Sequence, residues 1–98
     1  MAVYSIWESY FPPEVASEGQ EVTAGIWEDM TGFEGYLGHE LLQDVDDPGH
    51  LLVVSRWDSQ QRADQVLAAY AENPNAVEAN RLVDRPRRRI VAPKLPAG

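Results

Sequence analysis

Alternation of polar and apolar residues predicts a strand at the start of the chain. The run VYSIWESYF at 3–11 is rich in β-branched and aromatic residues, which suit a half-buried pleated surface. A period of two directs Tyr4, Ile6 and Glu8 to one face and Val3, Ser5, Trp7 and Ser9 to the other. Pro12-Pro13 ends this strand, because proline cannot donate a backbone hydrogen bond to a neighbouring strand.

Apolar residues at spacings of three and four predict helices further along the chain. The first helix covers 14–30, where the apolar stripe is Val15, Gly19, Val22, Ile26 and Met30, widened by Trp27. A second helix begins at Gln61 or Arg62, after an N-cap at Asp58-Ser59. Asn73-Pro74 breaks it, because the residue before a proline disfavours the helical region, and a shorter helix follows over 74–82.

Three further strands complete the pattern. The segments 33–44 and 50–57 form a hairpin around a turn at Asp46-Asp47-Pro48-Gly49, whose residues favour turn conformations. Within 33–44, one face carries Tyr36, Gly38, Glu40 and Leu42, and the other carries Leu37, His39, Leu41 and Gln43. The last strand covers 85–93 around Ile90 and Val91, and residues 93–98 are expected to end in a loose tail.

The order β-α-β-β-α-β predicts an α+β, ferredoxin-like domain that occupies 1–98, with two helices on one face of an antiparallel sheet. The opposite face has too little chain to cover it and includes large apolar residues such as Tyr36 and Leu42. We therefore expect a homodimer in which the open sheet faces of two copies pack together.

Composition narrows the classes of function. The chain has 98 residues, and 8 Lys and Arg against 16 Asp and Glu give a net charge of −8, which disfavours nucleic-acid binding. It has no cysteine, which excludes disulfides, thiolate zinc sites and cysteine nucleophiles. No apolar run approaches the ~20 residues of a membrane span. Met1–Tyr4 lacks the basic region of a secretory signal, so the expected location is cytoplasmic.

One stretch resembles a known family. Residues 32–64, GFEGYLGHELLQDVDDPGHLLVVSRWDSQQRAD, are similar to the antibiotic-biosynthesis monooxygenase family of dimeric α/β barrels. The shared motifs are Phe33-Glu34-Gly35-Tyr36, Trp57-Asp58-Ser59 and Asn73-Pro74, and the similarity extends over about 3–92. The family includes cofactor-independent oxygenases of phenols and quinols, haem-degrading enzymes and proteins of unknown role.

The resemblance implies a ligand pocket between the sheet and the helices, lined by the tryptophan that Trp57 matches. Alternation then places Leu51, Val53 and Ser55 on the same face, and the same register turns Leu37, His39 and Leu41 toward the helices. Quinone-forming members carry asparagine where this chain has Val53. The histidine and asparagine of haem-degrading members have no match here, so haem chemistry is not expected.

His39 is the main catalytic candidate. A neutral imidazole can take a proton from a phenol near neutral pH, and the phenolate then gives an electron to oxygen more readily. Trp57 offers a flat wall for an aromatic ring and an N–H donor for a developing oxyanion. A purely structural role remains the alternative for both. The predicted substrate-binding residues are Trp27, Tyr36, Leu41, Val53, Ser55, Tyr70 and Arg81, the last for an anionic group.

Two charged groups receive structural interpretations. His50 with Asp46 and Asp47 matches no recognised metal site, so a solvated turn is expected. Arg85 and Arg87-Arg88-Arg89 lie on a strand that sends alternate residues to opposite faces, so pairing with acids across a dimer boundary is expected.

The predicted function is cofactor-independent monooxygenation of a phenolic, quinol or polyketide-like aromatic to a quinone. No cofactor motif is present in the sequence, so the electrons would come from the substrate, and no metal is expected. The alternatives are a cyclase or isomerase of a similar small ligand, and a non-catalytic ligand-binding barrel protein. Fold alone does not decide among them.

Overall fold

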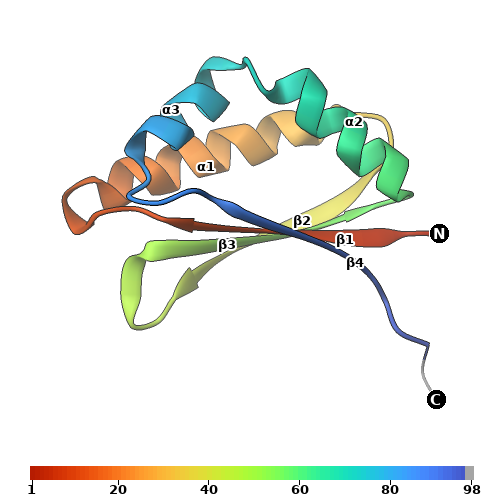
Figure 1. Ribbon diagram of the computed structural model, residues 1–98, viewed down its shortest axis with the longest axis horizontal. Coiled ribbons are helices and arrows are strands. Elements are labelled where there is room, and N and C mark those ends of the chain that lie inside the picture. The colour runs from red at the N-terminus through yellow and green to blue at the C-terminus, as the bar shows by residue number, and fades with distance from the viewer. Residues whose placement is uncertain (97–98) are drawn as a thin grey trace.

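The computed structural model describes residues 1–96, which form one four-stranded antiparallel sheet with three helices on one face (Figure 1). The elements are β1 (Val3–Tyr10), a 3₁₀ turn (Pro13–Val15), α1 (Ala16–Met30), β2 (Tyr36–Asp44), β3 (Asp47–Trp57), α2 (Gln60–Tyr70), α3 (Pro74–Leu82) and β4 (Arg88–Pro93). The predicted α+β, ferredoxin-like order is confirmed. Of the predicted loose tail, Ala97 and Gly98 lie outside the described residues.

The helical layer contains three helices rather than two, because Asn73-Pro74 divides the second one as predicted. The Ser59 hydroxyl accepts a hydrogen bond from the Arg62 N–H at 3.2 Å and caps α2. The Asn73 side chain accepts from the Asn75 N–H at 2.8 Å and caps α3. None of these helices, within residues 1–96, is long and apolar enough to cross a membrane.

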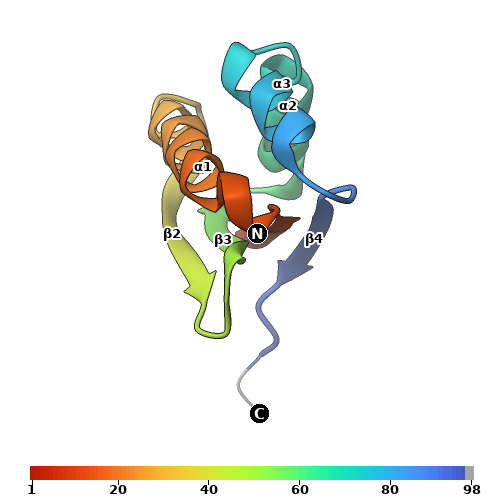
Figure 2. The ribbon, with the colours of Figure 1, turned by 90° about the vertical axis from the view of Figure 1, so that its left-hand side faces the viewer.

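The strand order is β2-β3-β1-β4, so β1 and β3 are central. In the end-on view of Figure 2, α1 lies over the β2 side of the sheet, and α2 and α3 lie over the β4 side. Antiparallel pairing places Trp57 of β3 opposite Val3 of β1 and Tyr36 of β2. Among residues 1–96, no helix or strand lies over the opposite face of the sheet in either view.

The face of the sheet that contacts the helices is the one predicted from β3. Leu51, Val53, Ser55 and Trp57 are all buried, with Ser55 and Trp57 only 1% exposed. Val53 and Trp57 pack with Val3 of β1 and with the α1 and α2 stripes, of which the buried apolar members are Ile26, Trp27, Met30, Ala63, Val66 and Tyr70. Leu51 packs in a second cluster with Phe11 and Leu82. The sequence pattern therefore identified the core face of this strand correctly.

The predicted alternation of β2 is wrong at its start. The pairing register shifts between Tyr36 and Gly38, so Leu37 is an extra residue in a β-bulge. Tyr36 consequently lies opposite Trp57 on the helix face, and Leu37 is 46% exposed instead of facing the helices. Beyond the bulge, His39 and Leu41 face the helices as predicted, opposite Ser55 and Val53.

The predicted turn at 46–49 is displaced. The turn is Val45–Asp46, and Asp47, Pro48 and Gly49 already belong to β3. The Asp47 carboxylate accepts from the Gly49 N–H at 3.0 Å, and the Gly49 carbonyl accepts from the Phe11 N–H at 2.7 Å. This contact extends β3 alongside the end of β1.

Other boundaries differ from the predictions by a few residues. The 3₁₀ turn delays α1 to Ala16, β2 begins at Tyr36 rather than Phe33, and β4 begins at Arg88 rather than Arg85. Such ends are the least determined part of a sequence pattern, because terminal residues lack a full set of neighbours.

Candidate functional site

A cavity of about 430 Å³ lies between the sheet and the helices. All three tryptophans of the chain border it, Trp7 from β1, Trp27 from α1 and Trp57 from β3. The remaining lining residues are Ser5, Ile26, Met30, Ala63, Val66, Leu67, Tyr70, Ala71, Ala76, Asn80, Pro86, Arg87 and Arg89. Three indole rings around one space favour a flat aromatic ligand.

The Trp57 ring is held firmly in the wall of this cavity. Its indole N–H donates to the Ser55 hydroxyl at 3.0 Å, and that hydroxyl donates to the Ser5 carbonyl at 3.0 Å. The Tyr36 ring meets it edge to face, with centroids 5.7 Å apart. The N–H predicted to serve an oxyanion is thus bonded within the protein, and Trp57 contributes an apolar wall.

Tyr70 also lines the cavity. Its hydroxyl donates to the Asp29 carboxylate at 2.6 Å and so ties α2 to α1. Burial, followed by this hydrogen bond, raises the pKa of Tyr70 to about 12. The phenol therefore stays protonated near neutral pH and does not act as a base there.

His39 does not border the cavity that Trp57 lines. Its Nδ1 forms a hydrogen bond of 2.6 Å with the Tyr36 hydroxyl, and its ring centroid is 5.6 Å from that of Trp27. It borders a second hollow of about 340 Å³, whose other lining residues are Tyr4, Gly38, Glu40, Val54, Ser55 and Arg56. The structure thus places the two predicted catalytic residues at different hollows.

The other predicted binding residues divide in the same way. Trp27 borders the cavity, whereas Val53 lies in the core beneath it and Leu41 is 42% exposed at the sheet edge. Ser55 does not border the cavity, and its hydroxyl accepts the hydrogen bond of the Trp57 indole that does. Arg81 lies on the exposed surface of α3, where it pairs with Glu78.

Sequence reasoning missed five polar or aromatic residues of the cavity: Ser5, Trp7, Asn80, Arg87 and Arg89. Pairing of β4 with β1 places Arg89 opposite Trp7, on the helix face, and Arg88 opposite Glu8, on the open face. The alternation predicted for this arginine cluster therefore indicated that some of its side chains face the helices. It did not show that two of the side chains reach the cavity.

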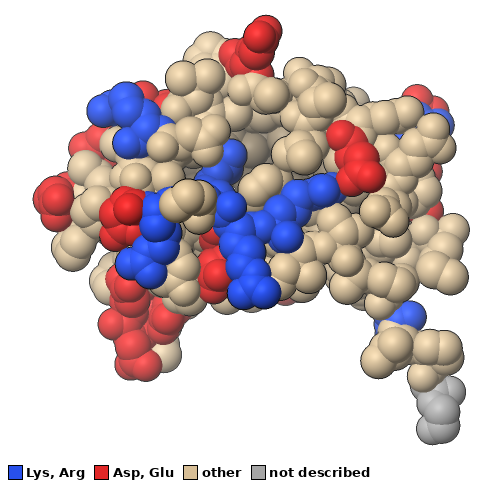
Figure 3. All heavy atoms as spheres, in the orientation of Figure 1, with Lys and Arg blue, Asp and Glu red and all other residues tan. Residues whose placement is uncertain are grey.

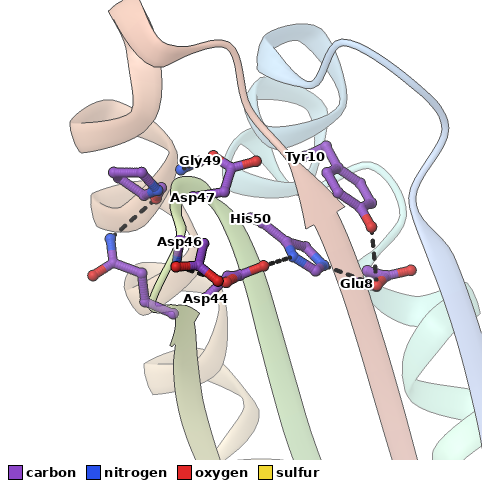
Figure 4. A network of polar contacts seen from close by, with 9 residues as sticks. Glu8, Tyr10, Asp44, Asp46, Asp47, Gly49 and His50 are labelled. Atoms are coloured by element: carbon purple, nitrogen blue, oxygen red, sulfur yellow. Dashed lines mark hydrogen bonds and ion pairs between the residues drawn. The ribbon is translucent and has the colours of Figure 1, made fainter.

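The open face of the sheet carries a network of charges around His50, in place of the predicted solvated turn (Figure 4). Nδ1 of His50 lies 2.8 Å from the Asp44 carboxylate, and Nε2 lies 2.8 Å from that of Glu8. The ring stacks on Tyr10, with centroids 4.1 Å apart. Within residues 1–96 no group of side chains is arranged to hold a metal ion.

These contacts shift the titration of all three groups. The hydrogen bond that His50 donates to Asp44 is the largest cause; together with the one it donates to Glu8, it outweighs burial and raises the pKa of His50 above its ordinary 6.5. The hydrogen bond to His50 is the main cause that lowers the pKa of Glu8 and of Asp44. The network is therefore strongest when His50 is protonated and both carboxylates are ionised.

Removing the imidazole charge should change the pH dependence of stability. We expect His50→Phe, which keeps a ring beside Tyr10, to be less stable than the parent, most clearly above the ordinary carboxyl values of 4.5 and 3.8 and below 6.5. The difference should shrink as the pH rises through the raised pKa of His50, and again as it falls through the lowered pKa of the carboxyls. Urea denaturation across pH measures it, and a pH-independent difference would contradict the expectation.

Comparisons with known proteins agree with this architecture. The family model described as "Antibiotic biosynthesis monooxygenase" matches residues 2–79. The solved structure of an antibiotic biosynthesis monooxygenase superposes with a TM-score of 0.85 at 17% identity, covering 96% of this chain and 99% of that one. A conserved protein from Methanosarcina mazei Go1 gives 0.81 at 16% identity, with 97% and 94% covered.

SnoaB, a cofactor-independent oxygenase from Streptomyces nogalater, superposes with a TM-score of 0.80 at 14% identity, and 98% of this chain and 94% of SnoaB are covered. At these identities the likeness shows the fold. No protein with a curated description matches the chain in sequence.

Proposed function

Because this chain belongs to the antibiotic biosynthesis monooxygenase family, we propose that it is a cofactor-independent monooxygenase that oxidises a phenolic, quinol or polyketide-like aromatic to a quinone. The observation that carries this proposal is the cavity of about 430 Å³ bordered by Trp7, Trp27 and Trp57. Its volume lies within the range of roughly 300–1,000 Å³ that small-molecule sites occupy. Flat indole walls complement a flat ring, and the helix layer shields the ring from water.

The proposed reaction balances without an external reductant. For a substrate whose ring carbon opposite the hydroxyl carries a hydrogen, one oxygen atom of O₂ enters that carbon, and the other leaves as water with the hydrogens of that carbon and of the hydroxyl. The aromatic substrate supplies the electrons that reduce O₂ and becomes the quinone. The protein's part is to bind the ring, orient it and keep water away from the reacting carbon.

Oxygen consumption tests this proposal directly. We expect the purified protein to accelerate O₂ uptake by an anthrone and to yield one quinone per O₂. Conversion of the ligand without O₂ uptake would identify a cyclase or isomerase instead, and binding without conversion would identify a ligand-binding protein. The role predicted for His39 remains a prediction, and the same assay with His39→Gln tests it.

We also propose that two copies pair through the open sheet face. This face carries apolar side chains from every strand, among which Leu42 and Ile90 are 43% and 40% exposed. Ile90 lies opposite Ile6, near the middle of the β1–β4 pair. A second copy offers an identical apolar face, which is the simplest cover for such a surface.

Ile90→Glu is expected to turn the dimer into a monomer, because each copy would have to bury an unpaired carboxylate in the apolar face of a chain that already carries −8. Light scattering after size-exclusion chromatography measures the molar mass. Val77→Glu is the matched control, since Val77 is 55% exposed on α3, in the helix layer. A parent protein of monomeric mass would overturn the proposed pairing.

A further inference from the structure

The apolar cavity has a cationic side. Four of the 8 basic residues of the chain, Arg85, Arg87, Arg88 and Arg89, lie within five positions of one another, and two of them border the cavity. Figure 3 shows basic side chains gathered between the helix layer and the sheet, beneath a hollow in the surface. This patch contrasts with a chain whose net charge is −8.

The two cavity arginines differ in their partners. Arg89 donates through Nη2 to the Asp64 carboxylate at 2.9 Å, so its charge is paired. The arginines that form ion pairs among residues 1–96 are Arg62, Arg81, Arg85 and Arg89, and Arg87 is not one of them. Arg87 thus keeps a formal positive charge that no carboxylate of the described chain neutralises.

The geometry around Arg87 fixes the side chain and leaves its outer donors available. Nε donates to the Asn80 side-chain oxygen at 3.0 Å, and the guanidinium carbon lies 4.9 Å above the centroid of the Trp7 ring. A guanidinium has five N–H donors, and this is the single hydrogen bond that Arg87 makes to the side chains and backbone of residues 1–96. The two terminal nitrogens therefore form a fixed fork of the kind that carboxylates match.

Burial removes part of the hydration of the Arg87 guanidinium. Arg87 is half-buried at the edge of the aromatic cavity, and loss of solvent lowers the pKa of its guanidinium. The group remains charged at neutral pH, and in such surroundings its attraction for an anion is screened less than at the surface. A half-buried charge that lacks a protein counterion favours a ligand that supplies one.

We propose that the cavity binds its aromatic ligand as an anion, whose negative oxygen, of a carboxylate or of an ionised ring hydroxyl, is held by the Arg87 guanidinium. The proposal rests on the proposed function and names its class of substrate. It also gives the substrate a fixed orientation, with the oxyanion beside the residue that precedes β4 and the ring between the three indoles. Among the residues that border the cavity there is no carboxylate or imidazole, so a ring hydroxyl would lose its proton to solvent before or during binding.

A matched pair of probes tests the carboxylate form by isothermal titration calorimetry. We expect 2-naphthoate to bind at least about tenfold more tightly than methyl 2-naphthoate, the lower end of what a hydrogen bond to a charged group contributes. Since a chain of net charge −8 repels anions as a whole, such a preference requires a local cation.

Substitutions of the arginines identify the residue that supplies this cation. Arg87→Gln should abolish the preference for the acid, and Arg87→Lys should retain part of it. Arg88→Gln is the matched control, because it removes the same charge from the adjacent residue, which begins β4 and lies opposite Glu8 on the open face of the sheet. Unchanged affinity for the ester shows that the Arg87→Gln cavity is still folded.

A second arm tests the phenolate form with 4-nitrophenol, whose absorption band moves on ionisation. We expect the parent and Arg88→Gln to lower the pKa of the bound phenol, and Arg87→Gln to lower it less. If only the preference for 2-naphthoate over its ester depends on Arg87, the anion is a carboxylate. If only the lowered pKa of the bound phenol depends on Arg87, the anion is an ionised ring hydroxyl.

The outcomes separate this inference from the proposed function. Equal binding of acid and ester together with an unshifted phenol would overturn the anion proposal and leave the aromatic cavity intact. A preference that survives in Arg87→Gln would also overturn it. Failure of both naphthalene probes to bind would overturn the cavity as a ligand site, and the proposed function with it.

Discussion

Trp57→Ala is expected to lower the free energy of unfolding by about 3–5 kcal/mol, the usual cost of truncating a large buried aromatic residue. The side chain is 1% exposed and is the largest fully buried one of the described chain. Its removal leaves the edge of Tyr36 without a partner and frees the Ser55 hydroxyl from the indole N–H. Both losses occur in the main core cluster, at the end of the central strand β3.

Denaturation in urea measures this loss as a lower midpoint at a similar slope. Trp57→Phe is the matched control, because it keeps a ring against Tyr36 and removes only the hydrogen bond to Ser55 together with part of the volume. We expect it to fall between the parent and Trp57→Ala. An alanine variant as stable as the parent would show that the indole is not part of the core.

Ala71→Trp is expected to lower anthrone oxidation by about a hundredfold, the order of loss found when reacting groups are displaced by about 1 Å. Ala71 borders the cavity at the end of α2, where its own side is exposed to solvent. An indole there can enter the cavity from its rim without displacing a buried residue. Ring and substrate would then compete for the same space.

Ala69→Trp is the control for this experiment, since Ala69 is also exposed on α2 but does not border the cavity. We expect this variant to keep the parent rate of O₂ uptake and a similar melting temperature. Equal rates for Ala71→Trp and the parent would place the reaction outside the cavity between the sheet and the helices.

The difference between His39 and Trp57 shows how far sequence patterns can reach. Alternation correctly predicted that both side chains face the helices, because that pattern indicates which face of a strand is buried. Although both side chains face the helices, only Trp57 borders the large cavity, and His39 borders the second hollow. Trp27 and Tyr36 approach His39, and the cavity lies on the other side, toward β1 and β4.

Tyr36 and Arg87 illustrate what local patterns omit. A bulge at Leu37 changed the face of Tyr36, and nothing in the period-two pattern indicated where the extra residue would lie. The arginine cluster was predicted to alternate between faces, and it does. Which of the two cavity arginines would find a carboxylate depended on Asp64, a residue of α2 that is 25 positions from Arg89 in the chain.

The sequence alone determined the order of elements, the helix break at Asn73-Pro74, the buried face of β3 and the family of the fold. Each of these depends on residues close together in the chain, whose spacing decides which surface becomes apolar. Only the tertiary structure decided which side chains surround the cavity, that the Trp57 N–H is already bonded, and that Arg87 lacks a counterion within residues 1–96. These features depend on long-range pairing, because a charge or an N–H donor is satisfied by whatever neighbour folding brings to it.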